Sequence, residues 1–93
     1  METRVRHDKE RSRYELLLDG EVIGVAEYYL NGDDLVFPHT EIGFAHRGQG
    51  LGAVLVRSAM DDVRATGRLV VPICWYVRDF LDANPDYQDL LAA

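Results

Sequence analysis

The sequence predicts an α+β domain in which an antiparallel strand meander leads into a β-α-β crossover and a C-terminal helix. Two turn signals, Asp19-Gly20 and Asn31-Gly32, separate strand-like runs in the N-terminal half. The hydrophobic period then changes from that of a strand to that of a helix over Leu51–Thr66. A nearly continuous apolar run at residues 69–73 follows the helix and is typical of a buried strand.

The N-terminal half should form three strands joined by hairpins, preceded by a short charged edge strand near the start of residues 5–13. The three strands are expected at residues 14–18, 21–30 and 35–44, where β-branched, aromatic and alternating apolar residues gather. Because the connections between them are short, the strands should run antiparallel. Pro38 cannot donate to a strand ladder, so it predicts a bulge or an open edge.

The helix predicted over Leu51–Thr66 has one apolar side and one charged side, and Gly67 is a plausible C-terminal stop. Arg57 and Asp61 lie one helical turn apart and are expected to pair weakly. Since a single helix separates the strand at residues 35–44 from the one at residues 69–73, the two can be parallel neighbours. A second helix is expected at residues 76–83, ended by Asn84-Pro85, with a helical turn at 86–91.

Composition limits the kind of protein. Ninety-three residues, 47% hydrophobic and 28% charged, are ordinary material for one domain over residues 1–93. The net charge of −6 argues against nucleic acid or an anionic membrane as the main partner. No run approaches the ~20 apolar residues of a membrane span, and the first residues lack the apolar segment of a signal peptide. The lone Cys74 excludes an internal disulfide. We expect a cytoplasmic monomer or weak dimer.

A glycine-rich stretch at residues 46–52 lies between the third strand and the long helix. A glycine loop that leads into a helix N-terminus presents free N–H groups at the positive end of the helix dipole, which favours anions and above all phosphate. The alternative is a tight turn without a ligand. A Walker loop would need Lys-Ser/Thr after its last glycine, but Ala53 follows Gly52, and an acidic residue of the dinucleotide-binding pattern is missing about 20 residues on.

The six residues Arg47-Gly48-Gln49-Gly50-Leu51-Gly52 match the pattern R-x-x-G-x-G, the pyrophosphate loop of GCN5-related N-acetyltransferases. With His39-Thr40-Glu41, Cys74-Trp75-Tyr76 and Asn84-Pro85 at their spacings, the chain resembles the small acetyltransferase-like family of YjdJ type over nearly its whole length. The resemblance implies a fold in which the two parallel strands splay apart. It also implies acetyl-CoA or coenzyme A as the cofactor, with the pantetheine arm in that gap.

The same resemblance assigns cofactor contacts. Backbone groups of Ile42 and Phe44 would meet pantetheine. Backbone N–H groups of the loop would meet the diphosphate, with a charge-assisted contact from the arginine side chain; these residues are Arg47, Gly48, Gln49, Gly50, Leu51 and Gly52.

Four residues are candidates for the chemistry. Strand alternation places His39 and Glu41 on one face, where they could share proton transfer or serve only as local structure. Cys74 could take the acetyl group as a nucleophile or simply fill space. Tyr76 could protonate the leaving thiolate or act as a packing aromatic. His7 has no metal-ligand partner at useful spacing, and neither has His46, so no metal site is expected.

Three classes of function follow from these residues. The leading one is an acetyl-CoA-dependent N-acetyltransferase acting on an unknown amine or protein acceptor. The second is a coenzyme A or acyl-CoA binding module without efficient transfer, and the third is a structural interaction domain whose glycine loop is only a turn. Tight N-terminal hairpins leave no room for the helical segment that shapes the acceptor site of larger acetyltransferases, so the acceptor side should be open.

Overall fold

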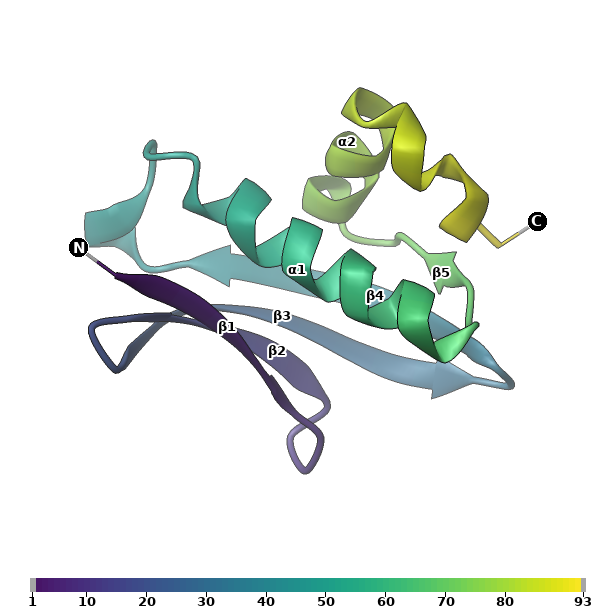
Figure 1. The fold of residues 1–93 in the computed structure, drawn as a ribbon, viewed down its shortest axis with the longest axis horizontal. Helices are drawn as coiled ribbons and strands as arrows, with labels where there is room; N and C mark the ends of the chain where they lie inside the picture. Colours follow the sequence, from purple (N-terminus) through teal and green to yellow (C-terminus); the bar gives the residue numbers. More distant parts are fainter. Residues whose placement is uncertain (1, 93) are drawn as a thin grey trace.

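The computed structural model describes residues 2–92 as one five-stranded sheet with helices packed against it (Figure 1). The sheet order is β1-β2-β3-β4-β5; β4 and β5 pair in parallel, whereas the other neighbouring strands pair antiparallel. The α+β class and the meander followed by a crossover are therefore confirmed. The elements are β1 (Thr3–Asp8), β2 (Arg13–Leu18), β3 (Glu21–Asn31), β4 (Asp34–Ile42), η1 (Phe44–His46), α1 (Leu51–Thr66), β5 (Val70–Val71), α2 (Trp75–Ala83) and η2 (Pro85–Leu90).

The hairpin turns form where the turn signals predict them. Asp19 and Gly20 connect β2 to β3 with φ values of 50° and 88°, the pair of positive angles that defines a type I′ turn. Gly32, at φ 63°, makes the turn between β3 and β4. Both turns match the right-handed twist of the strands they join, which keeps the meander antiparallel.

A bulge lies at Pro38, as the sequence predicts. The β3–β4 register shifts between Glu27 and Tyr29, where Phe37 and Pro38 together lie opposite Tyr28. An extra residue bends the strand that carries it and increases its twist. In β4, this bend precedes the half of the strand that leads to the glycine loop.

The parallel pair splays apart, as the resemblance implies. β4 and β5 are paired only near the start of β4, where Val36 lies opposite Val71. A further hydrogen bond runs from the Cys74 N–H to the Phe37 carbonyl (2.8 Å). Beyond it, residues 38–42 have no strand partner on the β5 side within the described part of the chain.

Two predicted strands are shorter than expected. β4 ends at Ile42 and not at residue 44, and Phe44 lies in the 3-10 turn η1 with 87% of its surface exposed. The apolar run at residues 69–73 forms a strand only at Val70–Val71. Pro72 has no N–H to continue the ladder, and Ile73 is 55% exposed, so the run is not the covered strand that its composition predicts.

The core lies between one face of the sheet and the two α-helices. Buried residues of β2, β3 and β4 form one cluster with α1, α2 and η2, and Figure 1 shows α1 running across the sheet with α2 above the β4–β5 side. α1 begins and ends where its periodicity predicts, and Gly67 at φ 77° closes it. The apolar side of α1 that meets the sheet comprises Leu51, Leu55, Val56, Ala59, Met60 and Val63.

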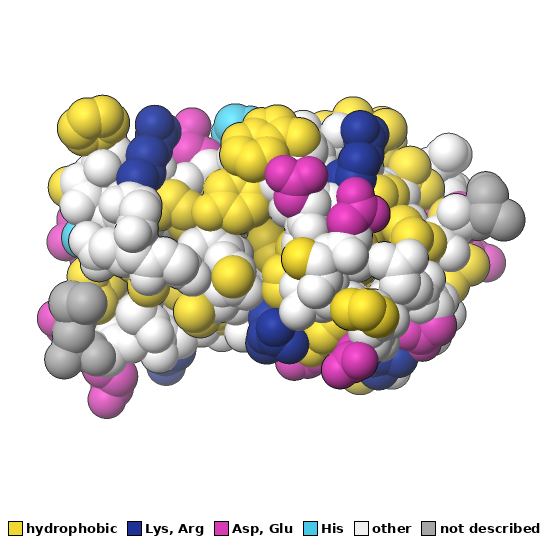
Figure 2. All heavy atoms as spheres, turned by 90° about the horizontal axis from the view of Figure 1, so that it is seen from above, with side chains coloured by type: hydrophobic (Ala, Val, Ile, Leu, Met, Phe, Trp, Pro, Cys, Tyr) yellow, Lys and Arg dark blue, Asp and Glu magenta, His cyan; other side chains and the backbone are white. Residues whose placement is uncertain are grey.

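The surface on the helical side is mixed in character. Figure 2 shows hydrophobic, basic and acidic side chains interspersed on this face. No helix within residues 2–92 has the length and apolar character needed to cross a membrane.

Candidate functional site

A cleft of about 390 Å³ opens where the unpaired half of β4 meets the glycine loop, the first turn of α1 and the first turn of α2. It brings together residues that lie up to 37 positions apart in the sequence, between His39 and Tyr76. The lining residues are His39, Thr40, Glu41, Ile42, His46, Arg47, Gly48, Gly50, Leu51, Gly52, Trp75 and Tyr76.

The backbone conformation requires glycine at two positions of the loop. Gly48 and Gly50 have φ values of 80° and 75°, a region that other residues rarely adopt, although a Cβ at either position would meet no atom within 4 Å. Gly50 is the N-cap of α1, no side chain caps this end, and the first turn has no acidic residue. The N–H groups at the start of α1 therefore face the cleft mouth without a carboxylate in place, as an anion site requires.

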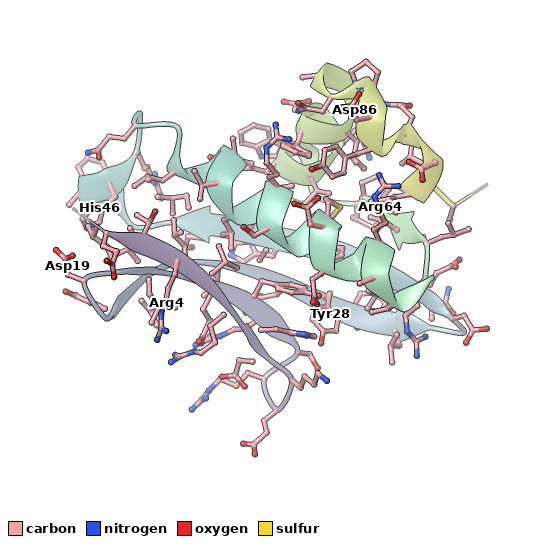
Figure 3. The ribbon with its side chains drawn as sticks, viewed as in Figure 1. Arg4, Asp19, Tyr28, His46, Arg64 and Asp86 are labelled. Carbon is pink, nitrogen blue, oxygen red and sulfur yellow. The ribbon has the colours of Figure 1, made fainter. Side chains whose placement is uncertain are left out.

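Arg47 folds back onto the end of β4. Its Nε donates a hydrogen bond to the Ile42 carbonyl (2.9 Å), and its guanidinium carbon lies 5.7 Å from the Phe44 ring centroid. These contacts hold the arginine at the mouth of the cleft, beside the N-terminus of α1. His46 lies at the same end of the molecule, whereas Arg64 lies toward the other end of α1 beside Asp86 (Figure 3).

Gly52 serves a different purpose from the other two glycines. A Cβ placed there would lie 1.6 Å from the Tyr76 hydroxyl oxygen and 2.1 Å from the adjacent ring carbon. Only a residue without a side chain lets the Tyr76 ring rest on the first turn of α1. Within residues 2–92 no side chain forms a hydrogen bond to the Tyr76 hydroxyl, and Tyr76 lines the cleft.

His39 and Glu41 share a face of β4, as the alternation predicts. The His39 Nε2 atom lies 3.5 Å from a carboxylate oxygen of Glu41, and the side chains are 51% and 59% exposed. Water therefore reaches both groups. The surrounding protein does not dehydrate the pair.

Thr40 points to the opposite face, toward the helices, and was not among the site residues proposed from the sequence. Its Oγ1 is the one buried side-chain oxygen or nitrogen in the described residues that has no hydrogen-bond partner. His46 and Trp75 also line the cleft without having been proposed. The sequence places Thr40 on the strand between the candidates His39 and Glu41. The alternation of side chains along a strand, however, does not show whether a hydroxyl has a hydrogen-bond partner.

Three proposed residues do not line the cleft. Phe44 projects from η1 into solvent, and Gln49 is exposed at the tip of the loop. Cys74 is 8% exposed and belongs to the core, at the N-cap position of α2 directly before two lining residues. The sulfur thus lies behind the cleft wall.

A second cluster of titratable groups lies away from the cleft, between β1, β3 and α1. The ring of His7 contacts the Tyr28 hydroxyl (2.6 Å) and Asp62 (3.3 Å), and Tyr14 donates to Asp62 (2.6 Å). Burial, with the hydrogen bond and charge of Asp62, raises the pKa of Tyr14 well above its usual range. Tyr14 therefore stays protonated, and the cluster ties the edge strand to α1.

No group of three metal-binding side chains occurs in the described residues.

Residues 13–90 match the family model of the GCN5-related N-acetyltransferases. Protein NATD1 of Danio rerio is 32% identical over 89 residues, covering 94% of this chain and 81% of that protein. Protein NATD1 of Homo sapiens is 32% identical over 84 residues, covering 88% and 74%.

Two solved structures share the fold. The solution structure of a GCN5-like protein from Staphylococcus aureus superposes with a TM-score of 0.73 at 15% identity, covering 97% of this chain and 88% of that one. An acetyltransferase of the same family from Streptococcus pneumoniae gives 0.57 at 18% identity over 67% of this chain and 42% of that one. The glycine loop, the splayed strand pair and the family match over most of the chain agree, and the chain belongs to the GCN5-related N-acetyltransferase family.

Proposed function

We propose that this domain binds acetyl-CoA in the cleft between β4, α1 and α2 and transfers the acetyl group to an amine. The observation that carries the proposal is the unpaired half of β4, which leads through η1 and the glycine loop to an uncapped helix N-terminus. Pantetheine contains two amides and can pair with a strand edge as an extra strand does. The diphosphate is suited to the N–H groups of the loop and of the first turn of α1.

Arg47 supports the anionic end of this arrangement. Only its Nε is used in the bond to Ile42, so the two terminal guanidinium nitrogens remain available for a phosphate oxygen. The Ile42 carbonyl, by contrast, already accepts a hydrogen bond from this arginine. We infer that Ile42 meets pantetheine through its N–H, whereas Phe44 lies in η1, outside the lining of the cleft.

For the chemistry, the amine nitrogen attacks the thioester carbonyl carbon. The tetrahedral intermediate then expels the coenzyme A thiolate, and the amine loses a proton. Glu41, with His39 beside it, is placed to accept that proton on the solvent-facing side of β4. Tyr76, on the facing wall, is placed to give a proton to the thiolate. Cys74 lies in the core, which favours direct transfer to the amine over an acyl-cysteine intermediate.

A second function is favoured by one specific observation. His39 and Glu41 are both more than half exposed, so no dehydrated environment prepares either as a base. A coenzyme A or acyl-CoA binding module without efficient transfer would have the same loop and the same splayed strands. Turnover of acetyl-CoA with a panel of amines separates the two functions. The proposal also includes an amine or protein acceptor, a cytoplasmic location and a monomeric or weakly dimeric state.

The binding site is tested by calorimetric titration of the wild type and Gly50→Val with coenzyme A. The substitution forces a β-branched residue into positive φ at the N-cap of α1, which displaces the loop N–H groups. We expect at least a tenfold loss of affinity.

Gly67→Val is the matched control. Gly67 closes the other end of the same helix at φ 77°, and a Cβ there meets no atom within 4 Å, as at Gly50. The two variants should lose comparable stability, by thermal unfolding, while only Gly50→Val loses affinity. Equal coenzyme A affinity in Gly50→Val and the wild type would show that the loop is only a turn.

A further inference from the structure

The orphan hydroxyl of Thr40 lies outside the glycine loop and has no role among the site residues predicted from the sequence. A buried hydroxyl without a partner costs free energy in the folded protein, so nearly all such groups are hydrogen-bonded. Thr40 Oγ1 is buried without a partner among residues 2–92, and its residue lines the cleft. The oxygen is shielded from water in the ligand-free protein, so an acceptor atom of a ligand in the cleft would satisfy it after a rotation of the Thr40 side chain.

The backbone of β4 indicates which part of a ligand lies there. Along an antiparallel pair, every second residue turns its N–H and C=O away from the neighbouring strand. The Ile42 carbonyl points away from β3, because it accepts from Arg47 at the cleft mouth. The backbone groups of Thr40, two residues earlier, therefore face the same side, in the gap between the splayed strands.

The position of Thr40 along the gap between the strands indicates which end of the ligand lies beside it. The strands meet for the last time at the bond between Cys74 and Phe37. Thr40 is three residues beyond this meeting point, which corresponds to about 10 Å of strand. The diphosphate loop begins seven residues farther on, at Arg47. A coenzyme A thioester that has its diphosphate at the loop and extends along β4 points its acyl end toward this meeting point, into the part of the cleft that Thr40 lines.

We propose that Thr40 Oγ1 donates a hydrogen bond to the thioester carbonyl oxygen of the bound acyl-CoA. The inference rests on the proposed function, since it takes acetyl-CoA as the ligand. When the amine attacks, the electron pair of the carbonyl moves onto this oxygen, and the same hydroxyl then donates to an oxyanion. The hydroxyl keeps its proton throughout, and the oxygen gives back the pair when the carbon–sulfur bond breaks. Thr40 is thus a catalytic residue that recognises acyl-CoA against free coenzyme A.

The test compares Thr40→Val with Thr40→Ser in two measurements. Valine has the shape of threonine without the hydroxyl, whereas serine keeps the hydroxyl. The first measurement is the ratio of the dissociation constants of coenzyme A and acetyl-CoA, obtained by calorimetric titration. We expect Thr40→Val to lower this preference for acetyl-CoA by about three- to tenfold, the value of one neutral hydrogen bond. Thr40→Ser should keep the wild-type ratio.

The second measurement is the thermal unfolding of the ligand-free protein. Because the hydroxyl has no partner without ligand, Thr40→Val should unfold at the same temperature as the wild type or higher. A structural hydroxyl would show the opposite result, since its loss would lower the unfolding temperature. With an amine that is turned over, kcat of Thr40→Val should fall by about 100-fold, as for the loss of an oxyanion donor.

Three results would overturn the inference or the function on which it rests. If Thr40→Val has the same ratio of dissociation constants as the wild type, the hydroxyl does not contact the acyl group. A lower unfolding temperature of ligand-free Thr40→Val would show that the hydroxyl already has a partner. Failure of the wild type to bind either coenzyme A or acetyl-CoA would contradict the proposed function and this inference with it.

Discussion

At the scale of single residues, the chemistry that we propose for the cleft depends on a pair of exposed groups, His39 and Glu41. Their side chains lie 3.5 Å apart on the solvent side of β4. Thr40, between them in sequence, points to the helical side and is shielded from water at its oxygen. In the proposed function, one strand therefore presents a proton acceptor to the amine on one face and a hydrogen-bond donor to the thioester on the other.

Glu41→Gln tests the proton acceptor. The amide keeps the shape and removes the base, so we expect kcat to fall by about 10²- to 10⁴-fold, while the affinity for acetyl-CoA stays unchanged. Glu27→Gln is the control, because Glu27 lies opposite His39 on β3. Full kcat in Glu41→Gln across the pH range would assign Glu41 a positional role only.

At the scale of elements, the contact between α1 and α2 depends on Gly52. Alanine is preferred to glycine in a helix by about 0.5–1 kcal/mol, yet a Cβ at Gly52 would overlap the Tyr76 ring. Gly52→Ala should therefore destabilise the protein by about 1–3 kcal/mol, the cost of overpacking. In a Tyr76→Ala background the same substitution should stabilise it, because the ring is absent.

Chemical denaturation of the four proteins of this double-mutant cycle measures the coupling directly. A change of sign between the two backgrounds is the expected result. The same small effect of Gly52→Ala in both would mean that Tyr76 does not rest on the helix in solution. Coenzyme A titration of Gly52→Ala then reports whether displacing Tyr76 also reshapes the cleft.

At the scale of the whole molecule, the sheet face away from α1 and α2 is held together by charge. Glu15 is 1% exposed on this face, and its two carboxylate oxygens receive Arg6 (2.6 Å) and Arg13 (2.7 Å). Figure 3 shows Arg4 projecting from β1 on the same side. Burial raises the pKa of Glu15, but the hydrogen bonds from the two arginines outweigh it, so the pKa is lowered overall.

A lowered carboxyl pKa contributes stability that is present above the unfolded value of about 4.3 and is lost as pH falls through the folded value. Glu15→Gln should lose about 1–3 kcal/mol at pH 7, since it leaves two arginines unpaired. Its free energy of unfolding should then fall less than that of the wild type on acidification below pH ~5. Denaturation from pH 7 to 3 measures both effects, with the exposed Glu21→Gln as control. Parallel pH profiles of Glu15→Gln and the wild type would contradict this account.

Local features of the chain could be predicted because they depend on neighbouring residues. The type I′ turn at Asp19-Gly20 and the extent of α1 follow from backbone preferences and from a hydrophobic period that lies within one window. The glycine loop was found for the same reason. The family assignment is confirmed by the comparison, and the YjdJ type stays a prediction.

Contacts between distant segments could not be predicted from such windows. The sequence predicts that Arg57 and Asp61 pair with each other. Each instead forms a hydrogen bond with Tyr87, at least 26 residues farther along the chain, because η2 packs against α1. The apolar run after α1 ends its strand at Pro72, and the strands therefore separate early. The way β4, α1 and α2 meet determines whether Gly52 faces phosphate or a tyrosine ring. It also determines whether the Thr40 hydroxyl has a hydrogen-bond partner. Residue type and spacing specify the elements, whereas the packing of elements far apart in the chain determines which polar groups remain free for a ligand.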